Sequence, residues 1–379
     1  MGINFTLTTK PGKEENALIF DTTIMNNFTI LAINTGSTST KAAVYRDENP
    51  ILELSLSHSA EEIARFDSIP EQAEWRKELI LRALEDKNIA LDSFSAVIGR
   101  GGLLHPIESG VYIVTDAMVE ELRTTPQQHA SNLSAPIALQ IARICGVKAY
   151  IADPVVVDEF MELARHSGIK QIPRRSIFHA LNQKATARLY AEQIGTPYEE
   201  LNLVVAHLGG GISVAAHQQG RVIDCNNALD GEGPITPERA GTIPAGDLID
   251  LCYSGEYSKK EARALLVGKG GLMSLMGTNS VKDLVQRAEE GDAEAKLAID
   301  LMVYTVSKQI GQMAVTLKGE VDAILLTGGI AHSKVITGAI SDYCRFLAPI
   351  EVYPGENELQ ALAMNALRVL RGEMSAKNY

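Results

Sequence analysis

A short run of small polar residues, Asn34–Lys41, combines the groups that bind a polyphosphate. The run reads Asn-Thr-Gly-Ser-Thr-Ser-Thr-Lys, so it offers the amides of a glycine turn, several hydroxyls and one ammonium. It is not a Walker A loop, because the Gly-Lys-Ser/Thr order is absent and a strand pattern follows. An ordinary hairpin with a tip rich in Ser and Thr explains these residues equally well when the run is taken alone.

Two further glycine motifs are suited to binding phosphate or nucleoside. Gly209–Gly211 are three consecutive glycines, which let a bulky anion approach the backbone closely, although such a run can simply be flexible. Leu325–Ser333 is a strand pattern that ends in a diglycine and turns toward a helix, where exposed amides can hold a phosphate. A plain strand-to-helix turn is the alternative there. The glycine tips at 34–41 and 209–211 together predict a pair of phosphate-binding hairpins that hold a nucleoside triphosphate from two sides.

Three single residues could act on a small anionic substrate. Arg100 stands between two glycines, which favours a bidentate grip on a carboxylate, although a lone loop arginine is usually solvated. His179 follows a basic pair and an apolar residue; it is either a buried structural histidine or a donor to a transferring phosphoryl group. Asp153 ends a strand pattern directly before a proline, so it either turns the chain or faces a cleft.

Strand patterns place two of the glycine tips at equivalent points of a repeat. A strand, a glycine tip, a strand, a turn and a strand occupy residues 28–56, and the same order returns at 201–226. We therefore predict an α/β protein with two structurally related domains. The other predicted elements are a helix that begins at residue 70, strands at 96–99 and 147–153, a helix at 293–317, a strand at 322–326 and a helix at about 357–371.

The composition excludes several classes of protein. The chain has 379 residues, and its formal net charge of −12 without a Lys/Arg block disfavours nucleic acid as a partner. Its four cysteines are far apart, so they predict neither a zinc site nor a disulfide framework, and a reducing cytoplasm fits best. No apolar run predicts a membrane helix, and residues 1–27 are interpreted as a leader or an over-extended N-terminus.

Taken together, the motifs resemble those of the butyrate kinases, within the acetate kinase group of the acetate and sugar kinase, Hsp70 and actin superfamily. The resemblance runs from about residue 30 to 370, and its most specific stretches are 33–41, 209–215, 226–234, 237–241 and 352–356. It implies two duplicated ribonuclease-H-like domains that close over ATP and Mg²⁺ in a central cleft. The implied division is 28–153 plus 359–379 for the carboxylate side and 154–358 for the nucleotide side.

The resemblance also implies roles for single residues. Arg100 would hold the substrate carboxylate, His179 would steady the transferred phosphoryl group, and Asp153 would be the active-site aspartate. The residues implied near the nucleotide are Ser37, Ser39, Lys41, His207, Gly209, Gly210, Gly211, Gly328, Gly329 and Ile330. Asn34 would help to place Mg²⁺.

Three positions depart from the acetate kinase pattern. Gly210 stands where acetate kinases carry Asn, so one side-chain donor is missing. Pro244 aligns with a family arginine, which nearby Arg239 would replace. Asn357 aligns with the metal glutamate of the family, and Glu356 and Glu358 flank it as candidate ligands.

The implied reaction is the reversible transfer of a phosphoryl group from ATP to butyrate, which yields butanoyl phosphate and ADP. A branched-chain fatty acid or propionate kinase on the same scaffold is an alternative, and a nucleotide-driven switch of the Hsp70 or actin kind is an alternative from another class. The resemblance further implies small-molecule substrates, a homodimer or higher homo-oligomer, and a cytoplasmic location.

Overall fold

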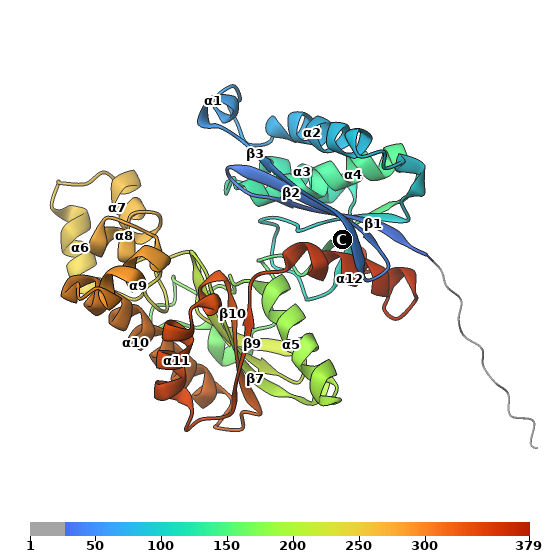
Figure 1. Ribbon diagram of the computed structural model, residues 1–379. Helices are drawn as coiled ribbons and strands as arrows, with labels where there is room; N and C mark the ends of the chain where they lie inside the picture. The colour runs from blue at the N-terminus through green and yellow to red at the C-terminus, as the bar shows by residue number, and fades with distance from the viewer. Residues whose placement is uncertain (1–26) are drawn as a thin grey trace, which may run out of the picture.

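The computed structural model describes residues 27–379, and in it two β-sheets form the centres of two lobes (Figure 1). The predicted leader at 1–27 lies, except for its last residue, outside the described residues. The first sheet has the strand order β3-β2-β1-β4-β6-β5. Its strands are β1 (Thr29–Thr35), β2 (Ser39–Arg46), β3 (Asn49–Ser57), β4 (Ala96–Gly99), β5 (Val111–Ile113) and β6 (Lys148–Ala152).

The second sheet repeats the plan of the first. Its order is β11-β10-β7-β8-β9, with strands β7 (Asn202–Leu208), β8 (Ile212–Gln218), β9 (Arg221–Cys225), β10 (Ala323–Gly328) and β11 (Ile350–Pro354). In both sheets an antiparallel meander of three strands is followed by a strand parallel to the first one, because β4 pairs with β1 as β10 pairs with β7. The predicted duplication is therefore confirmed.

Helices cover both faces of each sheet. The first sheet packs against α2 (Gln72–Asp86) and α4 (Ser134–Cys145) through one apolar core and against α12 (Glu358–Leu370) through another. The second packs against α10 (Ala293–Thr316) and α11 (Lys334–Cys344) on one side and against α5 (Ala180–Ile194) on the other. The remaining α-helices are α1 (Ala60–Ile63), α3 (Asp116–Thr124), α6 (Ala245–Tyr253), α7 (Lys259–Leu266), α8 (Leu272–Met276) and α9 (Val281–Glu289).

The connection between the lobes determines where a site can form. The chain enters the second lobe after β6 and returns through α12, which follows β11 and packs on β1. α12 also contacts α5, so the two helices meet where the lobes join (Figure 1). This arrangement agrees with the predicted division at 153/154 and 358/359, which stays a prediction. α6 to α9 lie at the far end of the second lobe (Figure 1).

Candidate active site

The first glycine tip joins β1 to β2, and a buried arginine of α2 supports it. The Gly36 amide donates a hydrogen bond to the Ser39 carbonyl oxygen (2.8 Å), which closes the turn. Arg76 is fully buried and donates to the carbonyl oxygens of Gly36 (2.7 Å), Ser39 (3.1 Å) and Ser37 (3.2 Å). Arg76 therefore stabilises the turn from its buried side, while Ser37 and Lys41 remain exposed.

The second glycine tip joins β7 to β8, and an arginine guanidinium lies directly against it. A Cβ atom on Gly211 would lie 1.8 Å from Nη1 of Arg239, so only glycine leaves room for this side chain. Arg239 also donates to the Ala228 carbonyl oxygen, and the Gly210 carbonyl oxygen accepts from the Thr236 hydroxyl (2.8 Å). The tip and the guanidinium thus form one surface that offers hydrogen-bond donors.

The diglycine after β10 lies beside the second tip. Gly328 has φ +91°, and a Cβ there would lie 2.4 Å from the carbonyl oxygen of Leu208. Both the conformation and the close approach require glycine. Gly329 and Ile330 begin a short 3₁₀ turn that leads into α11, and Gly329 is exposed. The second and third motifs are therefore neighbours in space, as a shared nucleotide site requires.

Arg100, Asn34 and Glu358 form a connected group at the carboxyl ends of β1 and β4. Nη2 of Arg100 lies 3.1 Å from Oε1 of Glu358, and the Asn34 amide donates to the other oxygen of the same carboxylate. Oδ1 of Asn34 is buried and has no hydrogen-bond partner among the described residues. An unsatisfied buried carbonyl oxygen beside a carboxylate is a suitable pair of ligands for a hard cation.

Glu356 approaches this group from the other lobe. Its Oε1 atom lies 3.6 Å from Nε2 of His207. His207 holds the pKa of Glu356 below its ordinary value, and Arg100 and Lys41 add to the effect. Residues from both lobes thus share one electrostatic environment, and Glu356 is ionised near pH 7. Within residues 27–379 no cluster of three or more His, Cys, Asp or Glu side chains forms a complete metal site.

Two histidines, His179 directly before α5 and His207 on β7, stack face to face. The rings of His179 and His207 are 3.8 Å apart between centroids and inclined by 10°. Nδ1 of His179 lies 2.8 Å from Oγ of Ser213, and Nδ1 of His207 lies 2.7 Å from Oδ1 of Asn182. Burial, then His207, Arg100 and Arg239, lower the pKa of His179 well below its ordinary value. His179 is therefore neutral near pH 7.

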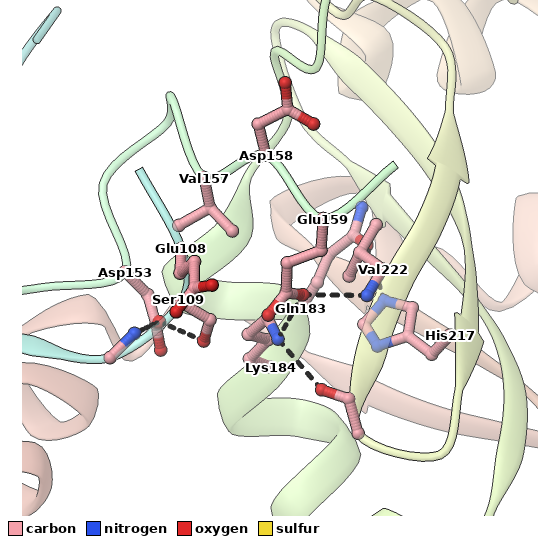
Figure 2. Close-up of polar contacts among 12 residues, drawn as sticks. Glu108, Ser109, Asp153, Val157, Asp158, Glu159, Gln183, Lys184, His217 and Val222 are labelled. Carbon is pink, nitrogen blue, oxygen red and sulfur yellow. Dashed lines mark hydrogen bonds and ion pairs between the residues drawn. The ribbon is translucent and has the colours of Figure 1, made fainter. Parts of the chain in front are cut away.

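Asp153 has a different environment from the histidines. Its carboxylate accepts hydrogen bonds from the Ser109 hydroxyl at 2.6 Å (Figure 2) and from the Gly110 amide at 2.9 Å. It also pairs with Arg188 (3.3 Å). Burial alone would raise the pKa of Asp153, but Arg188 and Lys184, together with the two hydrogen bonds, outweigh burial and hold the pKa below its ordinary value. This buried carboxylate ties β5 and β6 to α5, and its catalytic role stays a prediction.

The sequence interpretation missed four polar residues of the candidate site. One is His129, on a loop before α4; burial, and then the charges of Arg100 and Arg239, lower its pKa. The sequence Gln-Gln-His-Ala around it contains no motif that could have indicated this. The other missed residues are Asn182, Gln183 and Ser213. Asn182 and Gln183 follow His179 by three and four residues, a helical spacing that could have drawn attention to them.

Solved structures with a similar fold include an acetate kinase and a propionate kinase. The acetate kinase of Porphyromonas gingivalis matches with a TM-score of 0.75 at 17% identity, covering 90% of this chain and 100% of that one. The propionate kinase of Francisella tularensis matches with a TM-score of 0.71 at 18% identity, covering 89% and 98%. The predicted fold class, two duplicated domains of the actin, Hsp70 and sugar kinase type, is confirmed.

The family follows from sequence comparison. Residues 161–348 match the model of the acetokinase family. Butyrate kinase 2 of Clostridium acetobutylicum is 52% identical over 353 residues, covering 93% of this chain and 99% of that protein. A probable butyrate kinase of Phocaeicola vulgatus is 52% identical over 350 residues, covering 92% and 99%. The chain belongs to the acetokinase family, and the resemblance to its butyrate kinases is confirmed. No helix within residues 27–379 combines the length and apolar character of a membrane span.

Proposed function

We propose that this protein transfers the terminal phosphoryl group of ATP to the carboxylate of butyrate, reversibly, to form butanoyl phosphate and ADP. It is a phosphotransferase with a carboxyl group as acceptor, as expected for relatives named butyrate kinase at 52% identity. The observation that carries the proposal is the convergence of groups from both lobes. Glu356 lies 3.6 Å from His207 of the second lobe and next to the glycine tip at Gly209, and the charge of Arg100 of the first lobe helps to lower its pKa.

The chemistry needs cations more than it needs a base. A carboxylic acid with a pKa near ~4.3 is already an anion at pH 7, so no group has to remove a proton. Its approach to a polyphosphate is opposed by about 4 kcal/mol for two unit charges 4 Å apart at an effective dielectric near 20. Arg100 and Arg239 supply fixed positive charge at the junction of the lobes, which offsets this repulsion and stabilises charge that develops during transfer.

The nucleotide is proposed to lie across the three glycine motifs. Ser37, Ser39 and Lys41 would contact the phosphates from the first lobe, and Gly209–Gly211 would do so from the second. Gly328–Ile330 would contact the adenosine. The close packing of Gly328 against Leu208 supports a single continuous surface for these contacts.

The oxygen ligands present fit Mg²⁺, which commonly takes one or two carboxylates together with substrate phosphates. Oδ1 of Asn34 is buried and unsatisfied among the described residues, and the Glu358 carboxylate lies next to it. Asn34, Glu358 and ionised Glu356 would hold the ion. When bound, it would neutralise charge on the phosphates. Arg100 keeps Glu358 in place, and His179 offers a neutral donor to the phosphoryl oxygens.

Trapping with hydroxylamine tests the proposed function. The purified protein is incubated with ATP, Mg²⁺ and straight or branched acids of two to five carbons, and the acyl hydroxamates are quantified. We expect butyrate to give the most product. A variant, Arg100→Ala, is expected to lose at least about 10²-fold in acyl phosphate formation and to retain ATP binding by calorimetry. Absence of hydroxamate from every acid, or a preference for acetate, would refute the proposal.

A further inference from the structure

The stacked histidines are held by two neighbouring amide side chains of α5, Asn182 and Gln183. Because His179 and His207 lie in the proposed transfer site, the position of each ring proton decides which nitrogen can donate to a phosphoryl oxygen. Each amide also contacts a backbone carbonyl oxygen, which fixes its orientation. The positions of the ring protons can therefore be deduced from the hydrogen bonds.

The orientation of Gln183 follows from its contact with the Ser213 backbone. Gln183 is fully buried, and its nitrogen lies 3.0 Å from the Ser213 carbonyl oxygen and 2.8 Å from Ser213 Oγ. A carbonyl oxygen can only accept, so the amide nitrogen must face it. The amide oxygen then faces Nε2 of His217 (3.0 Å), which must donate.

A second layer holds this orientation. With its proton on Nε2, His217 accepts from the Tyr198 hydroxyl at Nδ1 (2.7 Å). Both side chains are buried. Burial, then Lys184 and Arg188, lower the pKa of His217 well below its ordinary value, so it is neutral. Figure 2 shows Lys184 on α5 directed toward Glu159, which places a fixed cation near His217.

The hydroxyl of Ser213 links the fixed orientation of Gln183 to the ring of His179. Its oxygen accepts from the Gln183 amide (2.8 Å) and from the backbone amide of His179 (3.3 Å). Both acceptor positions of the oxygen are then used, so the single hydroxyl proton points to Nδ1 of His179 at 2.8 Å. Nδ1 of His179 is therefore unprotonated, and the ring proton is on Nε2.

The same reasoning shows that Nδ1 of His207, unlike Nδ1 of His179, carries a proton. The Asn182 nitrogen donates to the Glu356 carbonyl oxygen (3.0 Å), so its Oδ1 atom accepts from Nδ1 of His207 (2.7 Å). His207 thus carries a proton on Nδ1. The two adjacent amides of α5 give the stacked rings different protonation patterns.

We propose that Asn182 and Gln183 are positioning residues for the ring protons of the two stacked histidines. Asn182 holds the Nδ1 proton of His207, and Gln183, through Ser213, sets the tautomer of His179, so that His179 presents a neutral Nε2–H donor to the transferring phosphoryl group. The assignment rests on the proposed function for its consequence in catalysis. The tautomers themselves follow from the hydrogen bonds alone. An ionised glutamate in place of Gln183 cannot donate a hydrogen bond to Ser213. The Ser213 hydroxyl oxygen can then accept a hydrogen bond from a proton on Nδ1 of His179.

Imidazole ¹⁵N NMR on the full-length protein tests the tautomers without reference to activity. The His179 signals are identified by their loss in a His179→Gln variant. We expect a protonated Nε2 and an unprotonated Nδ1 in the unsubstituted protein, and a proton on Nδ1 in Gln183→Glu. A proton on Nδ1 of His179 in the unsubstituted protein would overturn the assignment, whether or not the protein phosphorylates butyrate.

Kinetics test the consequence for catalysis. In Gln183→Glu we expect kcat for hydroxamate formation to fall by about 10²-fold, with the KM values for ATP and butyrate changed less than about threefold. Gln309→Glu is the matched control, because Gln309 is another buried glutamine on a helix of the same lobe. We expect it to leave kcat and the His179 signals unchanged. A Gln183→Glu protein with unchanged tautomer and unchanged kcat would overturn the proposal.

Ser213→Ala tests the same point if Gln183→Glu does not fold. This variant removes the hydroxyl that donates to Nδ1 of His179, so we expect a mixture of the two His179 tautomers and a reduced kcat. If His179 instead kept the Nε2–H form alone, the proposed role of the Ser213 hydroxyl would be wrong. An unsubstituted protein that shows the expected tautomers and forms no hydroxamate would refute the proposed function and leave the tautomer assignment intact.

Discussion

Replacing Arg76 with methionine tests whether this buried cation holds the first glycine tip. Arg76 is fully buried, and its guanidinium also donates to Oε1 of Gln72 (2.8 Å). Among the described residues no carboxylate pairs with it, because its acceptors are the carbonyl oxygens of Gly36, Ser37 and Ser39 and two neutral side chains. The positive charge therefore acts on the turn itself, and burial lowers the pKa of Arg76 to about 10.

The magnitude follows from the bonds that Arg76→Met would break. Three carbonyl oxygens each lose a bond to a charged donor, worth about 1.5–3 kcal/mol apiece. Removal of the buried cation offsets several kcal/mol of that loss, because its desolvation cost also disappears. We expect a net loss of about 2–4 kcal/mol in the free energy of unfolding. ATP affinity should fall at least about tenfold, since the released turn would have to be reordered on binding.

Urea denaturation and calorimetric titration with ATP measure these two effects. Arg82→Met on the same helix is the matched control, because Arg82 is exposed. This substitution removes the same charge without affecting the turn. We expect the control to change stability by less than about 0.5 kcal/mol. A loss below about 1 kcal/mol in Arg76→Met, with unchanged ATP affinity, would refute the reasoning.

Three further outcomes are expected. Gly211→Ala should fold normally and lose about 10²-fold in kcat, because the new methyl group displaces the flexible Arg239 guanidinium. Circular dichroism measures the folding and the hydroxamate assay measures kcat. Full activity would contradict the prediction. Lys184→Met should destabilise the protein by about 3–5 kcal/mol because it leaves the largely buried Glu159 carboxylate without its cation. Adding Glu159→Gln should restore part of this loss, as measured by urea denaturation. The pKa of Asp153 is lower in the folded than in the unfolded protein, so its contribution to stability is present above the unfolded pKa and is lost as the pH falls through the folded pKa. Asp153→Asn should therefore flatten the decrease in the free energy of unfolding below about pH 5. An unchanged slope would contradict this.

The sheets and glycine tips could be predicted from the sequence because their signals are local. The predicted strands at 28–34 and 96–99 correspond to β1 and β4, and the predicted helix at 293–317 corresponds to α10 within one residue. Continuous apolar runs in the strands, apolar periodicity in the helix and glycine at the turns depend only on neighbours in the chain. The short strands β5 and β11 were not predicted. β11 spans only five residues and none of them is buried, so its apolar run is short.

The contacts within the site could not be predicted in the same way. Asn34 and Glu358 are 324 residues apart, and no pattern in either segment indicates that they share a hydrogen bond. Arg76 lies on an amphipathic helix with several charged residues, where an arginine is normally solvated. Only the packing of α2 on the first sheet turns its guanidinium toward the glycine tip.

By itself, the sequence determined the chemical groups and the backbone that carries them: glycine tips that expose amides, an arginine between glycines, and a repeated strand order. Tertiary structure decided which groups act together. It stacked His179 on His207 and placed Gln183 under Ser213, and so determined where the ring protons lie. The reason is physical, because a side chain's donors, charge and protonation depend on the atoms that surround it after folding, and those atoms come from segments distant in the chain.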